Sequence, residues 1–416
     1  MMRRTLAIAV VAASTFVFTA PAAQAHIATP TWSTVNSVST GDQDAPAIAT
    51  NRNGYVAVVW EDDRDTDDAT DNVHSEIYIR TYRNGTALYE KKLSAAGSSG
   101  VTNWRHLHPD VGLDDKGNAV VVWQDDPDGN GYYNIPYRVL NISGTVTASG
   151  NANSSATGQQ INPQVAVDPD GAPAGGAVAF TVVWEDIQTG TSATVKAAGF
   201  TGPTTRAWQV TGSTTSGRHH NPDVAVSASG DAVVVWDDDG DANSSYEIGL
   251  IRLGRTNGAA TLSRRVANSN SGGQQTHPAV AANFNGDFAV AWESDHTGTA
   301  GSWTRSFTAT GAARFADVQV AAGGKAPSIG IDDASQTVVG WTVQNLDVWV
   351  RGFGTEGTDT GRLSSQQLNS VPENRQEQMA VAVSPFAQVA VAYTDDNDSN
   401  TYDQIYLGQD FSNNSW

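Results

Sequence analysis

Residues 109–125 read PDVGLDDKGNAVVVWQD, and this pattern decides the fold because variants of it recur along the chain. Each copy has a proline, an alternating apolar stretch, a Gly or Asp turn, and a dense apolar stretch that ends in an aromatic residue. Short β-branched runs bounded by turn residues predict two antiparallel strands per copy. The seven copies span Pro46–Trp60, Pro109–Trp123, Pro163–Trp184, Pro222–Trp236, Pro278–Trp292, Pro327–Trp341 and the degenerate Met379–Tyr393.

Two more strands are expected after each copy. The third carries a basic residue in six copies, namely Arg80, Arg138, Lys196, Arg252, Arg305 and Arg351. Seven units of four strands predict an all-β fold, a seven-bladed β-propeller with four antiparallel strands per blade, as one domain over residues 26–416. The segment Thr31–Val38 matches a fourth strand, and the last copy ends with a third strand at Gln404–Gly408. We therefore expect the N-terminal strand to complete the C-terminal blade.

Composition and the N-terminus restrict the partners and the compartment. The 416 residues carry a net charge of −20, which disfavours nucleic acid and anionic membrane surfaces as partners. The chain has no cysteine, which excludes disulfides, thiolate catalysis and cysteine-ligated metals. Residues 1–25 are typical of a secretory signal peptide, because Arg3 and Arg4 precede the apolar run Leu6–Phe18 and an A-x-A site ends at Ala25. We expect a secreted, extracellular protein.

The repeat resembles the TolB-like propeller repeat and the Asp-rich repeats of large bacterial surface proteins, which share the Pro-x-Val-Ala strand, the Gly-x-x-Val-Val-x-Trp strand and the basic third strand. This resemblance implies that the Pro-led strand is innermost, and that the loops before the first and after the second strand share one rim. The acidic residues of that rim would be Glu61, Asp62, Asp63, Asp125, Asp126, Glu185, Asp186, Asp237, Asp238, Asp239, Glu293, Asp295, Asp395 and Asp396, with His108, His219, His220 and His277 beside them.

Several acidic loops have the spacing of a calcium loop. The ligand positions would be Asp126, Asp128 and Asn130 in one loop, Asp237, Asp239 and Asp241 in a second, and Asp396 and Asp398 in a third. The final bidentate glutamate of such loops is missing, so a calcium site and a solvated acidic turn both stay open. Zinc is a weaker alternative. His106, His108, His219 and His220 are candidate ligands, but no H-E-x-x-H motif occurs.

Glutamines gather in the polar segments that lead into the inner strands. They are Gln43, Gln159, Gln160, Gln274, Gln275, Gln366, Gln367, Gln376 and Gln378. Exposed glutamine in such loops is accessible to a cross-linking transglutaminase, and we take these nine as candidate glutamine donors. Ordinary polar loop composition is the alternative.

The full-length repeat, the export signal, the lack of cysteine and these glutamines together resemble the family of dispase autolysis-inducing proteins. The resemblance implies a secreted propeller that acts on an extracellular neutral metalloprotease, promotes its autolysis and serves as a transglutaminase substrate. No G-x-S-x-G or P-loop motif occurs, so we expect a non-catalytic interaction protein. The alternative is a carbohydrate-active enzyme or lectin that uses the acidic rim with Trp104, Tyr132, Tyr133 and Trp303.

Overall fold

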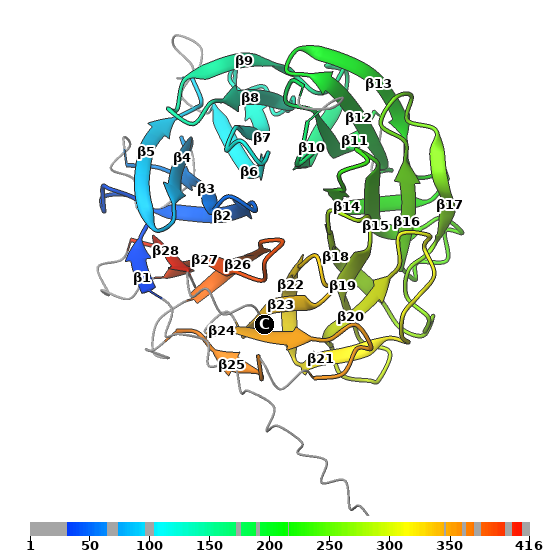
Figure 1. Ribbon diagram of the computed structural model, residues 1–416. Helices are drawn as coiled ribbons and strands as arrows, with labels where there is room; N and C mark the ends of the chain where they lie inside the picture. Colours follow the sequence, from blue (N-terminus) through cyan, green and yellow to red (C-terminus); the bar gives the residue numbers. More distant parts are fainter. Residues whose placement is uncertain are drawn as a thin grey trace, which may run out of the picture.

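The computed structural model describes residues 31–64, 74–95, 104–171, 176–188, 192–214, 216–344, 347–359, 363–369, 376–395 and 402–409. These residues form 28 strands in seven four-stranded antiparallel sheets, arranged as blades around a central axis (Figure 1). The predicted seven-bladed propeller is confirmed. The expected signal peptide and the calcium candidates Asp396 and Asp398 lie outside the described residues. In the described part of the chain, no helix could span a membrane.

The first four blades follow the chain, each from its inner to its outer strand. Blade 1 contains β2 (Gln43–Thr50), β3 (Tyr55–Asp62), β4 (Glu76–Arg83) and β5 (Thr86–Lys92). Blade 2 contains β6 (Arg105–Leu113), β7 (Ala119–Asp126), β8 (Pro136–Leu140) and β9 (Val146–Asn151). Blade 3 contains β10 (Gln159–Val167), β11 (Phe180–Ile187), β12 (Thr194–Gly202) and β13 (Thr205–Thr211). Blade 4 contains β14 (Arg218–Val226), β15 (Ala232–Asp239), β16 (Glu247–Leu253) and β17 (Ala260–Val266).

The remaining blades close the ring. Blade 5 contains β18 (Gln275–Ala282), β19 (Phe288–Ser294), β20 (Gly301–Phe307) and β21 (Val318–Ala322). Blade 6 contains β22 (Gly324–Ile331), β23 (Thr337–Val343), β24 (Asp347–Phe353) and the short β25 (Gln366–Gln367). Blade 7 contains β26 (Gln376–Val383), β27 (Val389–Asp395), β28 (Gln404–Gln409) and the N-terminal strand β1 (Thr31–Thr34).

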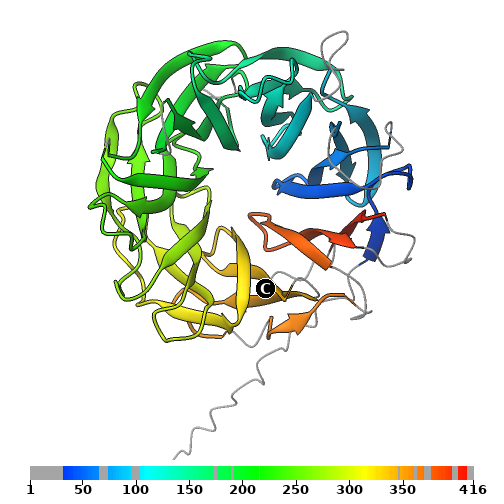
Figure 2. The ribbon, with the colours of Figure 1, turned by 180° about the vertical axis from the view of Figure 1, so that it is seen from behind.

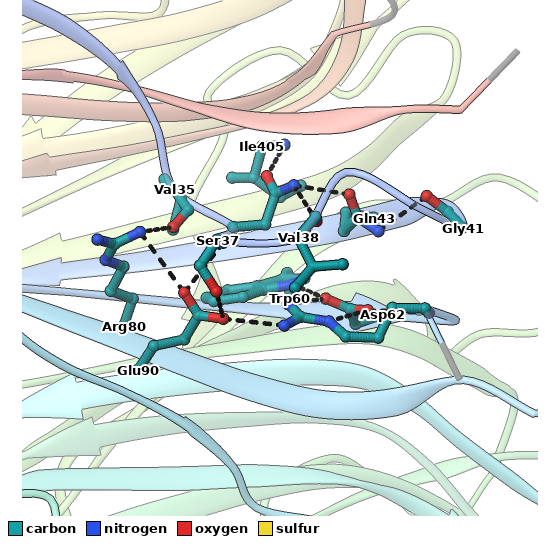
Figure 3. Close-up of polar contacts among 12 residues, drawn as sticks. Val35, Ser37, Val38, Gly41, Gln43, Trp60, Asp62, Arg80, Glu90 and Ile405 are labelled. Carbon is teal, nitrogen blue, oxygen red and sulfur yellow. Dashed lines mark hydrogen bonds and ion pairs between the residues drawn. The ribbon is translucent and has the colours of Figure 1, made fainter. Parts of the chain in front are cut away.

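The ring closes where β1 pairs antiparallel with β28, as the sequence predicted (Figure 2). The Trp32 ring contacts Tyr393 of the same blade edge-on, with 5.6 Å between ring centroids. The buried Asn36 then joins blade 7 to blade 1. Its Nδ2 donates to Gln43 Oε1 at 2.8 Å and to Gln404 Oε1 at 2.6 Å. Figure 3 shows Gln43 and Ile405 at this junction. Because the first and last described segments share one sheet, no blade at this junction is left with an unpaired third strand.

Each interface between blades contains its own hydrophobic cluster. The aromatic residue that ends each second strand packs against the preceding blade, and Trp60, for example, lies in a cluster with Ala392 and Leu407 of blade 7. The members of this aromatic series are exposed by 3% or less: Trp60, Trp123, Trp184, Trp236, Trp292, Trp341 and Tyr393. Their regular spacing in the sequence therefore reflects packing between sheets and not ligand stacking.

Three basic residues of the third strands also connect each blade to the preceding one. Arg80 donates to the carbonyl of Val35 on the preceding blade, and Arg305 donates to that of Ala267 at 2.8 Å. Arg351 Nη1 donates to the carbonyl of Val320 at 3.1 Å. A guanidinium supplies several donors in a fixed geometry, so it can satisfy backbone carbonyls on a neighbouring sheet.

Candidate functional site

A cavity of about 970 Å³ lies on the propeller axis, where the seven inner strands begin. Every blade contributes to its wall, and the segment around the proline of each copy lines it. A smaller cavity of about 130 Å³ lies at the other end of the same strands. There the Arg52 guanidinium lies 4.1 Å from the Phe284 ring centroid, and its Nε lies 3.0 Å from Asp115. The cavity is therefore a funnel with a wide mouth and a narrow far end.

A bulge shapes the mouth in all seven blades. The residue before the proline, or before Met379 in blade 7, has a left-handed backbone with φ between 45° and 53°. The register of the two innermost strands shifts at this residue in every blade. These residues are Ala45, His108, Asn162, Asn221, His277, Ala326 and Gln378. A left-handed backbone is unfavourable for non-glycine residues, so the surrounding structure must stabilise it.

In blades 2 to 6, the residue that follows the buried aromatic of the preceding blade provides this stabilisation. Glu61 Oε1 accepts the backbone N–H of His108 at 2.7 Å, and Glu185 Oε1 accepts that of Asn221 at 2.8 Å. The same bond, from the left-handed residue to the preceding blade, occurs in three further pairs: Asn162 to Gln124, His277 to Asp237 and Ala326 to Glu293. We call these side chains the clasp residues. Four predicted rim acids therefore hold adjacent blades together.

Burial changes the ionisation of two clasp residues. Desolvation raises the pKa of Glu61 to about 8, and the His108 N–H only partly offsets this. Burial likewise raises the pKa of Asp237 to about 8, against hydrogen bonds from Asn221 and His277. Both carboxyls are mostly protonated at pH 7 in the native protein. Their side chains are almost fully buried, with exposures of 5% and 3%, and Glu61 forms part of the funnel wall.

Four carboxyls line the funnel, namely Asp44, Glu61, Asp110 and Asp223, and the last two lie one residue after the proline. Asp110 in blade 2 accepts the N–H of Val165 at 2.6 Å, and Asp223 in blade 4 accepts that of Val280 at 2.7 Å. Burial raises the pKa of Asp110 to about 7, and the charge of Asp223 raises it further. Burial raises the pKa of Asp223 to about 6. The funnel thus holds two electrostatically coupled carboxyls that titrate near neutral pH.

Polar side chains surround this pair at the mouth. His108, Asn162, Asn221, His277 and Gln378 line the funnel from blades 2, 3, 4, 5 and 7, and Arg105 lies on the wall of blade 2. Blades 1 and 6 present alanine at the same place. Burial lowers the pKa of His108, which favours its neutral ring as a donor and acceptor. Blades 2 to 5 therefore form a continuous polar side of the mouth, and both Asp110 and Asp223 lie on this side.

A second group of polar side chains supports the wall in blades 3 and 4. His220 Nδ1 lies 2.9 Å from Glu185 Oε2, and hydrogen bonding to Glu185 raises the pKa of His220. Asn162 Nδ2 donates to Glu185 Oε1 at 2.7 Å, and Asn221 Nδ2 donates to Asp237 Oδ2 at 2.7 Å. These contacts fix the orientation of both asparagines at the mouth.

The acidic loops predicted to bind calcium are held by their own hydrogen bonds. Asp126 accepts the N–H groups of Asn130 and Gly131, and Asn130 Nδ2 donates to Asp128 at 2.9 Å. The Asp239 loop repeats the arrangement, because Ser244 N–H donates to Asp239 and Asn243 Nδ2 donates to Asp241. Asp237 lies outside that loop, in β15. Among the described residues, no three His, Asp or Glu side chains gather as metal ligands, for calcium or for zinc.

Many of the other acidic residues of the predicted rim have buried side chains. Asp62, Asp63, Asp126, Asp186, Asp239 and Asp395 are less than 9% exposed. The pairing of Gln43 with Asp62 and of Arg218 with Asp239 confirms that second strands end where first strands begin. Of the aromatic residues named for a sugar-binding rim, Tyr132 is 55% exposed, whereas Trp303 is 8% exposed. The predicted rim is therefore present, but many of its carboxylate side chains are buried in the protein and not exposed to solvent.

The nine glutamines expected in exposed loops are partly buried, partly half-buried and partly exposed. Gln43, Gln160, Gln275 and Gln376 are at most 1% exposed, so the expectation of exposed loop positions is wrong for these four. Their amides bond to neighbouring loop carbonyls and acids, as Gln160 does with Thr157 and Asp186. Gln159, Gln274 and Gln366 are half-buried, and Gln367 and Gln378 are exposed. Gln378 Oε1 accepts the N–H of Ala45, while the Gln367 amide donates to Asp347.

The pattern that predicts the acidic rim does not include Asp110 and Asp223, because both lie inside the strand that begins at the proline and not after the tryptophan. A signal was present, because the residue after the proline is Ala, Gln or Ser in the other copies and Asp only in these two. A charged residue on the innermost strand of a propeller is unusual for a packing position and marks the channel wall.

Comparison with known proteins extends only to the fold. No protein-family profile and no curated protein matches this sequence. An α-L-arabinofuranosidase of Fusarium graminearum, solved with arabinobiose, is 11% identical over 76% of this chain and 96% of its own, with a TM-score of 0.51. The enzyme with an iminosugar inhibitor gives 11% identity over 74% and 94% of the two chains and a TM-score of 0.52. An α-L-arabinanase of Penicillium chrysogenum is 11% identical over 74% of this chain and 94% of its own, with a TM-score of 0.49.

These similarities correct one expectation from the sequence. We expected a non-catalytic protein because common catalytic motifs are missing. An α-L-arabinofuranosidase has the same fold, so the lack of those motifs does not argue against an enzyme, and the expectation is wrong as an argument from motifs. Catalytic groups on a propeller come from separate blades, so a short motif does not record them. At 11% identity the similarity establishes the propeller and nothing about a substrate.

Proposed function

We propose that the funnel binds a carbohydrate and that Asp110 and Asp223 hydrolyse a glycosidic bond within it. The observation that carries this proposal is the pair of funnel carboxyls on blades 2 and 4, with pKa values raised to about 7 and about 6. Most glycosidases use two carboxyl groups, one protonated and one ionised. The shared fold with arabinose-releasing enzymes agrees with this reading but does not select a sugar.

The environments of the two carboxyls assign their roles. Between about pH 6 and pH 7, Asp223 is the more ionised and Asp110 the more protonated. Asp110 is then the general acid that protonates the leaving oxygen, and Asp223 is the base or nucleophile. The charge of Asp223 contributes to the raised pKa of Asp110, so ionisation of one disfavours ionisation of the other. The neutral His108 and the oriented Asn162 and Asn221 provide hydrogen-bond partners for sugar hydroxyls.

The test is hydrolysis of a panel of aryl glycosides and plant and bacterial polysaccharides by the full-length protein. Asp110→Asn and Asp223→Asn should each lower turnover by about 10²-fold or more, because each removes a proton-transfer or nucleophilic group. Asp128→Asn, on an exposed loop outside the funnel, is the matched control and should retain activity. Thermal melting of each variant shows whether it folds. Full activity in both funnel variants, or no hydrolysis of any glycoside, contradicts the proposal.

A second proposal keeps the partners implied by the family resemblance, a secreted metalloprotease and a transglutaminase. The exposed Gln367 supports glutamine donation, because its side chain is accessible on the two-residue outer strand β25. Incubation of the purified protein with dispase should speed the appearance of dispase fragments. An unchanged fragmentation rate contradicts the protease part of this proposal.

A further inference from the structure

Blades 2 and 4 share a set of side chains at the mouth of the funnel. In both blades an arginine lies four residues before the proline, as Arg105 and Arg218. In both blades a tyrosine lies ten residues after the buried tryptophan, as Tyr133 and Tyr246. The same two blades carry the two carboxyls that we propose as catalytic. A comparison of the two arginines therefore shows what each contributes to the mouth.

The two loops that carry the tyrosines are fixed in the same way. The Tyr133 N–H donates to Gln159 Oε1 of blade 3 at 3.3 Å, and the Tyr246 N–H donates to Gln274 Oε1 of blade 5 at 3.1 Å. A glutamine on the next blade therefore holds each loop at its tyrosine. Because the loops are anchored alike, a difference between the two arginines has another cause.

The two arginines have different partners. Arg218 Nη2 lies 3.2 Å from Asp239 Oδ2 and donates to the Ser244 hydroxyl at 3.3 Å, so Arg218 holds the loop of its own blade. Asp126 lies opposite Arg105 in the strand register, but its carboxylate accepts backbone N–H groups of the loop. Arg105 lines the funnel instead. No carboxylate in the described part of the chain forms an ion pair with Arg105.

Arg105 places a permanent positive charge in the funnel wall. Among the described residues that line the funnel, it is the only arginine or lysine. The acids of the wall neutralise it only in part, because burial raises the pKa of Glu61 to about 8 and that of Asp110 to about 7. Burial also raises the pKa of the Tyr133 hydroxyl, while the charge of Arg105 and a hydrogen bond with it act in the opposite direction. A guanidinium has five N–H groups, so a bond to this hydroxyl leaves others for a molecule in the funnel.

We propose that Arg105 binds the carboxylate of a uronic acid unit, so that the saccharide that enters the funnel is acidic. A planar guanidinium binds a carboxylate through two parallel hydrogen bonds, and a neutral hydroxymethyl group cannot form this pair. Tyr133 is a positioning residue that orients the guanidinium, whereas Arg218 is occupied by Asp239. The inference rests on the proposed binding of a carbohydrate in the funnel and names the class of that carbohydrate.

The first test compares saccharides that differ only in this charge. Calorimetric titration of the full-length protein at pH 5.5 measures the affinity for glucuronate, galacturonate and digalacturonate, each against its neutral counterpart glucose, galactose or galactobiose. Glu61 and Asp110 are mostly protonated at this pH, whereas the uronates are ionised. At least one acid should bind about 10-fold or more tightly than its neutral counterpart, because only the acid forms charge-assisted bonds to the guanidinium. Equal affinities in every pair, or no binding of any uronate, overturn the inference.

The second test uses variants, and melting without ligand shows whether each one folds. Arg105→Gln should weaken binding of the preferred uronate by about 10-fold or more and leave the neutral sugar unchanged. Arg105→Lys keeps the charge without the planar fork and should retain part of the preference. Tyr133→Phe should weaken only the uronate, and by less than Arg105→Gln. Arg218→Gln is the matched control and should keep the full preference. A preference that survives in Arg105→Gln overturns the inference.

Failure of this inference can be distinguished from failure of the proposed function. A protein that hydrolyses neutral glycosides and does not prefer uronates contradicts the inference and leaves the proposed function intact. A protein that binds uronates through Arg105 and hydrolyses no glycoside supports the inference and contradicts the proposed hydrolysis. Tighter binding of glucose 6-sulfate than of glucuronate overturns the assignment to a carboxylate.

Discussion

The clasp residue Glu61 gives a quantitative prediction about the effect of pH on stability. Its carboxyl accepts the His108 N–H and is buried, and burial raises its pKa from 4.5 to about 8. A raised native pKa means that the folded state binds the proton more tightly than the unfolded state. The stability from this proton is complete below about pH 4.5 and is lost as the pH rises toward 8. Glu61→Gln removes this dependence and keeps an oxygen to accept the N–H.

The magnitude follows from the shift. A pH of 7 lies 2.5 units above the pKa of 4.5 that the Glu61 carboxyl has in the unfolded chain, and each unit corresponds to ~1.36 kcal/mol. The wild-type fold is therefore about 3 kcal/mol less stable at pH 7 than below pH 4.5 through this one group. A chain of this length has an unfolding entropy near 0.8 kcal/mol/K, so Glu61→Gln should raise Tm by about 4 °C at pH 7 and by almost nothing at pH 4. Glutamine fits such a site, because Gln124 makes the same bond to Asn162 at 2.7 Å.

Thermal melts of wild type and Glu61→Gln at pH 4, 5.5, 7 and 8 measure this difference. The reciprocal change Gln124→Glu is the matched control and should lower Tm progressively as the pH rises. A Glu61→Gln variant that is less stable than wild type at pH 7, or whose Tm difference does not depend on pH, would refute the assignment of a buried, protonated clasp.

Three further predictions concern packing, closure and accessibility. Trp236→Ala leaves a cavity between blades 3 and 4 and should cost about 3–5 kcal/mol, measured by urea unfolding, whereas the exposed Tyr132→Ala should change stability by less than about 0.5 kcal/mol. Removing residues up to Thr34 leaves the outer edge of β28 without a partner strand and should lower Tm, with an unchanged Tm contradicting closure by β1. Transglutaminase with an amine probe should label Gln367 and leave Gln43 and Gln160 unlabelled in the native protein, as peptide mapping would show.

The repeat made the fold predictable from sequence, because it records the packing of one blade on the next. The buried aromatic series, the bulge before each proline and the strand that completes blade 7 follow the sequence pattern closely. The aromatic series and the bulge recur in all seven blades, so their pattern rises above local variation. The acidic loops had no such repeated constraint to distinguish a buried side chain from an exposed one.

The site depended on information that no single repeat contains. Asp110 and Asp223 are 113 residues apart in the sequence, and they share a cavity only because the ring brings blades 2 and 4 around the same axis. Their raised pKa values come from burial within that ring and, for Asp110, from the charge of Asp223. The role of Glu61 as a clasp was equally hidden, since its partner His108 belongs to the next blade.

The sequence by itself determined the number of blades, the order of strands and the place where the ring closes, because periodic apolar patterns encode local pairing directly. Only the tertiary structure decided which polar side chains face the funnel, which are buried as clasp residues, and which carboxyls have a raised pKa. Burial and charge proximity between residues on different blades are properties of the assembled ring, and spacing along the chain does not record them.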